Sequence, residues 1–300
     1  MEEIDQDFLK VLREHGYEYL SLVGSSGFGK VYLVQSEKYN QPFACKVGKN
    51  FSGLGEEIKL LSNILNQFII QIYDWFKFGD NIGAILDYCP NGTIRDYIFK
   101  HGPLNCDQMQ QVIHSLFTAI QVCHSRNIIH RDIKPSNILI DTHGYLKLSD
   151  FGLSMVVERG TLITTTSGST PFMAPEMFSQ KEFDPFAADI WAIGVTLFVM
   201  LTGILPWIAE DKVTLIEEIK KGFNHPLKFR EDEVSKIITR CLIVDPTKRP
   251  TIDQLVERMN FCKEKIALST FVRTPRRTKT FFQNCATRLV RRNSPVVFPY

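Results

Sequence analysis

The first third of the chain alternates short apolar runs with clusters of turn residues. Such runs, bounded by Gly, Asn, Asp or Pro, are typical of β-strands. One stretch, residues 56–65, instead repeats its apolar positions at helical spacing and predicts a single helix. Strands are predicted over residues 19–23, 31–34, 43–47, 69–76 and 81–86.

From residue 93 onward the apolar spacing is helical. The run Ile190–Trp207 has no charge over eighteen residues, which is the lower limit for a membrane span. Gly203 and Pro206 interrupt it and nothing basic flanks it, so we expect a buried helix and no transmembrane segment. Helices are predicted over residues 94–99, 108–125, 189–201, 215–221, 232–241 and 252–261. Strands followed by helices predict an α+β fold.

The N-terminal residues 1–16 have a pattern of their own. Asp5 is a candidate N-cap and Gly16 a stop signal. The apolar residues between them, Phe8, Leu9, Val11 and Leu12, lie among polar residues at helical spacing. We therefore expect a short amphipathic helix that packs on the strand-rich first third of the chain.

The composition is that of a soluble globular protein, with 44% hydrophobic and 23% charged residues, and excludes disorder throughout. The seven cysteines are scattered without C-x-x-C spacing, so neither a disulfide framework nor a zinc site is predicted. The acidic segment Met1–Asp7 lacks the apolar core of a signal peptide. We expect a cytoplasmic protein, with the nucleus as the alternative.

The net charge of +2 is unevenly divided. Residues 261–300 hold nine Lys or Arg and one acid, which gives +8 there and 26 − 32 = −6 for residues 1–260. We interpret residues 261–300 as a basic, flexible tail, with an amphipathic helix for a calmodulin-like partner as the alternative. An acidic protein or a membrane surface would suit this charge, whereas no motif supports specific nucleic-acid recognition.

Residues 128–152 contain the candidate chemistry. His-Arg-Asp ends at Asp132, Asn137 follows five residues later, and Asp150 begins Asp-Phe-Gly. Two short apolar runs within residues 138–148, separated by a polar turn, predict a hairpin. A hairpin brings Asn137 and Asp150 to the same end, where an amide oxygen and a carboxylate can share Mg²⁺.

These motifs, in this order, resemble those of eukaryotic protein kinases. Later stretches agree: Ala174-Pro175-Glu176, Asp189-Ile190-Trp191 and the segment 245–250. Lys134, two residues after Asp132, is the family's mark of serine/threonine specificity. Within the family, the sequence of Ile190–Trp207 most resembles, though weakly, the calmodulin-dependent and AMP-activated groups. The resemblance implies a bilobal kinase domain over residues 17–260, with an N-lobe (17–86), a hinge (87–92) and a C-lobe (93–260).

The resemblance also implies roles in phosphoryl transfer from ATP. Asp132 would orient the substrate hydroxyl and accept its proton, and Lys134 would neutralise the γ-phosphate. Asn137 and Asp150 would hold Mg²⁺. Lys46 would pair with the α- and β-phosphates, with Glu57 as its partner and Glu56 as the fallback. The predicted nucleotide contacts are Gly24, Ser26, Gly27, Gly29, Val31, Ala44, Lys46, Leu86, Asp87, Cys89 and Leu139.

Two departures from the family pattern bear on activity. Ser26 stands where the glycine-rich loop has its middle glycine, and Glu57 follows Lys46 by only eleven positions. By itself, a glycine-rich turn between strands fits either phosphate binding or a simple hairpin. A catalytically weak or inactive kinase-like scaffold is therefore the alternative to an active enzyme.

Residues 153–173 are rich in Thr and Ser. A flexible polar loop explains this composition, but Arg131 offers a cation that a phosphate could bind. The resemblance favours Thr165 as the phosphosite, with Thr164 and Thr166 as close rivals, and implies an upstream activating kinase. It also implies that Ser169 contacts Lys134 and that Glu176 and Arg249 form an ion pair.

Overall fold

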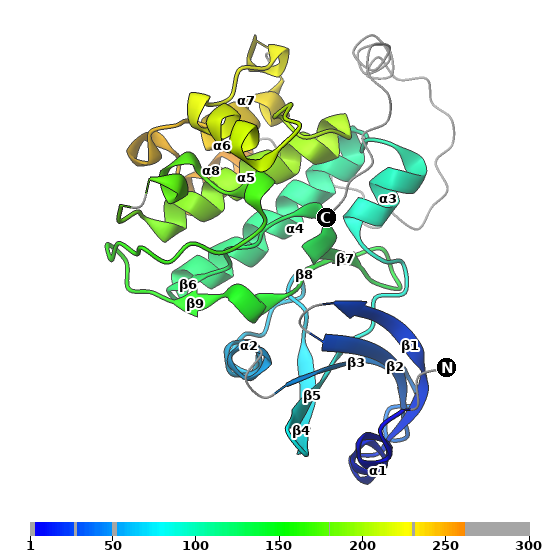
Figure 1. The fold of residues 1–300 in the computed structure, drawn as a ribbon. Coiled ribbons are helices and arrows are strands. Elements are labelled where there is room, and N and C mark those ends of the chain that lie inside the picture. The colour runs from blue at the N-terminus through cyan, green and yellow to red at the C-terminus, as the bar shows by residue number, and fades with distance from the viewer. Residues whose placement is uncertain (1–3, 27–28, 50–52, 180, 230–231, 262–300) are drawn as a thin grey trace.

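The computed structural model describes residues 4–26, 29–49, 53–179, 181–229 and 232–261. These residues form two lobes joined by a short connection (Figure 1). The predictions for Gly27 and for residues 262–300 lie outside the described residues. The fold is α+β, with an antiparallel sheet in the N-lobe and a helical C-lobe.

The N-lobe is built on one antiparallel sheet with the strand order β1-β2-β3-β5-β4. Its strands are β1 (Tyr17–Ser26), β2 (Gly29–Ser36), β3 (Pro42–Lys49), β4 (Ile72–Phe78) and β5 (Asn81–Asp87). The predicted strand 69–76 begins late, because Ile70 donates its N–H to the C-lobe carbonyl of Leu148 (2.9 Å) instead of entering the sheet.

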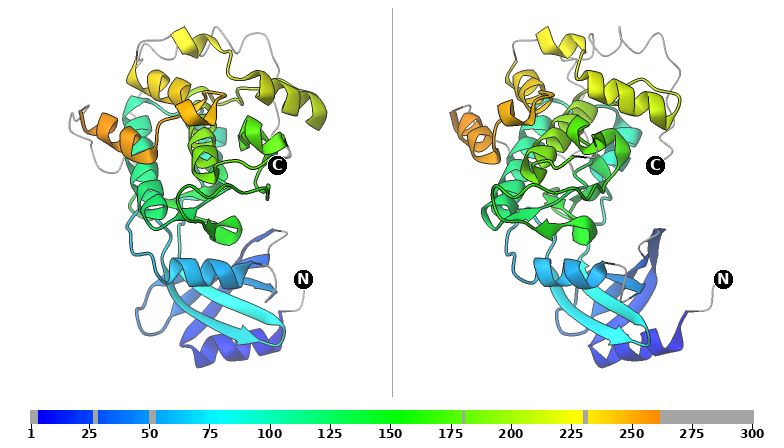
Figure 2. Two further views of the ribbon diagram at one scale, coloured as in Figure 1. Left: turned by 90° about the vertical axis from the view of Figure 1, so that its left-hand side faces the viewer. Right: turned by 60° about the vertical axis from the view of Figure 1, so that its left-hand side comes forward.

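Helix α2 (Leu54–Leu61) is shorter than the predicted 56–65. It ends where the backbone bonds shorten to i−3, with Asn63 N–H donating to Leu60 O at 3.2 Å. The Asn63 side chain also caps the Lys59 carbonyl at 2.8 Å, which favours leaving the helix. In the side views α2 lies next to the C-lobe, whereas α1 lies at the far end of the N-lobe (Figure 2).

Helix α1 (Gln6–Glu14) covers one end of the sheet. Asp5 caps it by accepting from the N–H of Asp7 at 2.9 Å. Phe8 and Leu12 are buried in a cluster with the sheet residues Val34, Phe43, Cys45, Phe76, Phe78 and Ile85. The helix is therefore part of the N-lobe core.

Replacing Leu12 with alanine should lower the free energy of unfolding by about 2–4 kcal/mol, because the removed side chain is fully buried and leaves a cavity. Urea denaturation followed by tryptophan fluorescence measures this. Leu65→Ala is the matched control, since Leu65 is 84% exposed in the same lobe. Equal losses in both variants would contradict an integral α1.

The C-lobe contains six helices in the described part of the chain and two short two-stranded ladders. The ladders are β6 (Ile128–Ile129) with β9 (Met155–Val156), and β7 (Ile138–Ile140) with β8 (Leu146–Leu148). The predicted hairpin after Asn137 thus forms as β7 and β8. The helices are α3 (Ile94–His101), α4 (Cys106–Ser125), α5 (Pro185–Thr202), α6 (Lys212–Lys221), α7 (Glu233–Cys241) and α8 (Ile252–Phe261).

Helix α5 is the core of the C-lobe. It begins at Pro185, four residues before the predicted start, because Asp184 caps it and proline suits the first turn. Among the described residues it is the one helix long and apolar enough to cross a membrane, and 83% of that stretch is buried inside the protein. This burial accounts for its uncharged sequence.

Candidate active site

The loop of residues 130–137, called the catalytic loop below, is anchored by one buried carboxylate. Asp189, in α5, accepts the backbone N–H of His130 and of Arg131, each at 2.9 Å. His124 adds a third contact at 3.0 Å. Burial alone would raise the pKa of Asp189, but the His124 and His130 contacts outweigh it and hold that pKa low. The sequence marks Asp189 only as the start of the Asp189-Ile190-Trp191 signature, because its partners His130 and Arg131 are distant in sequence.

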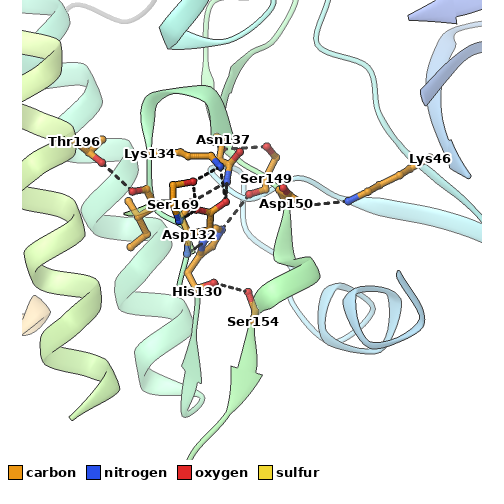
Figure 3. A network of polar contacts seen from close by, with 11 residues as sticks. Lys46, His130, Asp132, Lys134, Asn137, Ser149, Asp150, Ser154, Ser169 and Thr196 are labelled. Carbon is orange, nitrogen blue, oxygen red and sulfur yellow. Dashed lines mark hydrogen bonds and ion pairs between the residues drawn. The ribbon is translucent and has the colours of Figure 1, made fainter. Parts of the chain in front are cut away.

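Asp132 lies at the centre of a polar network (Figure 3). One oxygen contacts Lys134 Nζ at 2.6 Å, and the other accepts from Ser169 Oγ at 2.9 Å and Ser169 N at 3.0 Å. Asn137 Nδ2 donates to the Asp132 carbonyl at 2.8 Å. Burial would raise the pKa of Asp132, but Lys134 and Ser169 more than compensate, so its pKa lies below the usual value. Asp132 is an ionised acceptor.

Lys46 reaches from β3 towards the other lobe. Its Nζ lies 2.7 Å from Glu57 Oε2 and 3.0 Å from Asp150 Oδ1. Burial would lower the pKa of Lys46, but the two carboxylates raise it overall. Glu56 instead pairs with Lys59 at 2.6 Å on the exposed side of α2. The short spacing therefore does not keep Glu57 from Lys46.

Asp150 and Asn137 lie at the same end of the β7–β8 hairpin. Asp150 has left-handed backbone angles (φ 62°, ψ 69°). Asn137 uses its amide nitrogen on Asp132, which leaves its side-chain oxygen as a ligand. No group of three His, Cys, Asp or Glu gathers in the described residues. One carboxylate and one amide oxygen, completed by phosphates, are the donors that Mg²⁺ takes in phosphoryl-transfer sites.

A family profile described as "Protein kinase domain" matches residues 17–261. The chain belongs to the protein kinase family. Its relatives are serine/threonine kinases, which confirms the predicted resemblance near the calmodulin-dependent and AMP-activated groups.

Three relatives illustrate this similarity. Probable serine/threonine-protein kinase MARK-A of Dictyostelium discoideum is 32% identical over 263 residues, 85% of this chain and 25% of the relative. CBL-interacting serine/threonine-protein kinase 8 of Arabidopsis thaliana is 33% identical over 265 residues, which cover 85% of this chain and 59% of the relative. Serine/threonine-protein kinase SIK1 of Mus musculus is 30% identical over 254 residues, which cover 82% of this chain and 32% of the relative. The chain thus spans less than two thirds of each relative's length.

The sheet register of this kinase puts four of the predicted nucleotide contacts, Val31, Ala44, Lys46 and Leu86, on one face. Val31 is opposite Lys46, and Ala44 is opposite Leu86. Directly opposed residues share a face, as do Ala44 and Lys46 two positions apart. Leu139 approaches from β7, which bridges to residue 93 where the lobes meet. These side chains can therefore enclose a flat ring beside Lys46.

The glycine-rich turn closes with Ser26 opposite Gly29, and Gly24 pairs with Val31. Gly29 has φ +140°, and a Cβ there would lie 2.0 Å from Val47 O. Only glycine fits such an approach. The conformation of Gly27, and hence the effect of Ser26 on phosphate binding, is outside the described residues.

The hinge is tied to both lobes through Asp87. Its carboxylate accepts from Tyr73 OH at 2.8 Å and from Gln71 N at 2.9 Å, and pairs with Lys147 of β8 at 2.9 Å. The N–H of Asp87 donates to Gln71 O at 3.1 Å, so that amide is not available to adenine. Burial raises the pKa of Cys89 to about 12, so its thiol stays neutral. Tyr73 and Lys147 are not among the predicted site residues, because no motif marks them.

The activation segment, residues 153–173, contacts the catalytic loop at Ser169. Lys134 Nζ donates to Ser169 Oγ at 2.8 Å, which is the contact expected from the resemblance. Thr165 is exposed, as are its rivals Thr164 and Thr166. The Arg131 side chain donates to the Leu153 carbonyl, and among the described residues no hydrogen bond or ion pair joins it to Thr165.

Proposed function

We propose that the chain is a serine/threonine protein kinase that transfers the γ-phosphate of Mg-ATP to protein hydroxyls. One observation carries this proposal. Asp132 is kept ionised beside Asn137 and Asp150, and Lys46 of the other lobe reaches Asp150 at 3.0 Å. Charged groups from both lobes thus converge where a triphosphate has to be held.

In this reaction the substrate hydroxyl oxygen attacks the γ-phosphorus, the bond to the β-phosphate oxygen breaks, and ADP leaves. The hydroxyl proton passes to the Asp132 carboxylate. Lys134, 2.6 Å from that carboxylate, offsets charge on the transferred group. Mg²⁺, held by Asp150 and the Asn137 oxygen, would neutralise the phosphates. Lys46, oriented by Glu57, would hold the α- and β-phosphates.

Regulation by phosphorylation of the activation segment is part of this proposal. Thr165 is exposed, and Arg131, next to Asp132 in the chain, is the cation that a phosphate on Thr165 would bind. A phosphate would bring about −1.5 to −2 of charge to that loop. Mass spectrometry after treatment with activating kinases should place the activating phosphate on Thr165. If Thr165→Ala were still fully activated and Thr164→Ala or Thr166→Ala lost activation, the activating phosphosite would be Thr164 or Thr166 instead.

We also propose an acidic or calmodulin-like partner for residues 261–300, from their +8 charge, and a cytoplasmic location, from the scattered cysteines without C-x-x-C spacing. Binding of the full chain to Ca²⁺-calmodulin, compared with a chain ending at residue 261, tests the second point. Equal binding by the two chains would remove it.

Labelled ATP and a generic protein substrate test the kinase activity. Wild type should transfer γ-phosphate in a Mg²⁺-dependent way. Asp150→Asn and Lys46→Met should each lose about 10²–10³-fold in rate, because each removes a charge that positions phosphate. No transfer by wild type, even after treatment with activating kinases, would favour the kinase-like scaffold.

A further inference from the structure

The N-terminus of α2 rests directly on the Asp-Phe-Gly loop. Gly53 caps the helix with φ +84°. A Cβ built on Gly53 would lie 2.9 Å from the carbonyl oxygen of Gly152, closer than side chains tolerate. Two backbones from different lobes therefore touch at a point where neither residue has a side chain.

Gly53 is directly linked to the residue that orients Lys46. The Glu57 N–H donates to Gly53 O at 3.0 Å, which is the first hydrogen bond of the helix. Glu57 in turn holds Lys46 through Oε2 at 2.7 Å and the Phe151 N–H through Oε1 at 3.2 Å. Any outward shift at Gly53 is thus transmitted within one helical turn to both contacts of Glu57.

The short connection between β3 and α2 places Glu57 near the start of a short helix. Strand β3 ends at Lys49 and α2 begins at Leu54, and the helix has only eight residues. Glu57 consequently sits in the first turn, where helices fray, and the Gly53 cap has no side-chain hydrogen bond. The contact with Gly152 supplies support that a longer helix would obtain from additional turns.

We propose that Gly53 is a positioning residue for phosphoryl transfer. Its lack of a side chain lets α2 rest on Gly152, which keeps Glu57 within reach of Lys46 and Phe151. This inference rests on the proposed kinase function only for its activity readout. The packing at Gly152 can be tested without turnover.

The test compares Gly53→Ala with Gly55→Ala, one position inside the same helix. Gly55 has nothing within 4 Å of a built Cβ, so its replacement should fit. We expect Gly53→Ala to lower kcat by about 10- to 100-fold, as displaced catalytic groups do. Gly55→Ala should keep the wild-type kcat.

Gly53→Asn separates the contact from backbone strain. Asparagine tolerates positive φ far better than alanine, so this variant is also the one to use if Gly53→Ala does not fold. It still carries a Cβ. We therefore expect Gly53→Asn to remain impaired, and recovery to wild-type kcat would overturn the proposal in favour of strain alone.

Hydrogen exchange gives the readout independent of activity. The Phe151 N–H, bonded to Glu57, should exchange faster in both Gly53 variants than in wild type or Gly55→Ala. Unchanged exchange at Phe151 in folded Gly53 variants would overturn the proposal. An inactive wild type whose Phe151 exchange still responds to Gly53 would contradict the proposed function but support the packing.

Discussion

Replacing Asp132 with asparagine should lower kcat by about 10²–10⁴-fold, the range that general acid–base groups contribute. Asparagine keeps the shape and can still bind Ser169, so the fold is retained. It cannot accept the hydroxyl proton, and it no longer attracts Lys134, 2.6 Å away. Steady-state kinetics with saturating ATP measure the loss, and the melting temperature checks the fold. If the variant had near-wild-type kcat, a group other than Asp132 would accept the hydroxyl proton.

The pH profile links this loss to the observed contacts. The pKa of Asp132 is held below its usual value, despite burial, by Lys134 and Ser169. Activity needs the ionised form, so the acid limb of kcat/KM should lie below the ordinary aspartate pKa of about 3.9 where the protein stays folded. Ser169→Ala removes one donor, so the pKa should rise and the limb should move to higher pH. An unmoved or lower limb would contradict this reading.

Local periodicity was sufficient to predict most elements and part of the site. The period-two runs and helical repeats lie where β2, β3, β5 and α8 are found. Glu57, the predicted partner of Lys46, lies four residues before Leu61 and therefore on the same helix face. That face does point inward, and Glu57 contacts Lys46. Such inferences need only the geometry of a single element.

The parts that sequence reasoning missed depend on contacts between distant segments. Tyr73 and Lys147 read as ordinary strand residues, yet both bind the hinge carboxylate of Asp87. Gly53 looks like a loop glycine until Gly152, ninety-nine positions later, is found against it. Neither the spacing of residues nor the composition predicts which distant backbone segments will come into contact. For the same reason the predicted strand 69–76 started too early, because the Ile70 N–H donates to the C-lobe carbonyl of Leu148 and not to the sheet.

Arg249 should have the largest effect on stability. Its guanidinium forms a two-pronged ion pair with Glu176, at 2.6 and 2.7 Å, in the interior of the C-lobe. Arg249→Ala should reduce the free energy of unfolding by about 3–5 kcal/mol, because it leaves a carboxylate without its partner in a poorly solvated position. The backbone carbonyls that would also lose their donor are those of Ala187, Ile243 and Val244.

Two comparisons identify the cause. Arg258→Ala, which breaks the more exposed pair with Glu233, should change stability little. Arg249→Lys keeps the charge but cannot form the two-pronged contact, so urea denaturation should place it between wild type and Arg249→Ala. If lysine restored full stability, charge alone would hold Glu176. If lysine restored no stability, the hydrogen bonds from the planar guanidinium, including those to backbone carbonyls, would contribute more to stability than the charge does. Arg249 would then stabilise the fold mainly by holding the backbone near residue 176 in place.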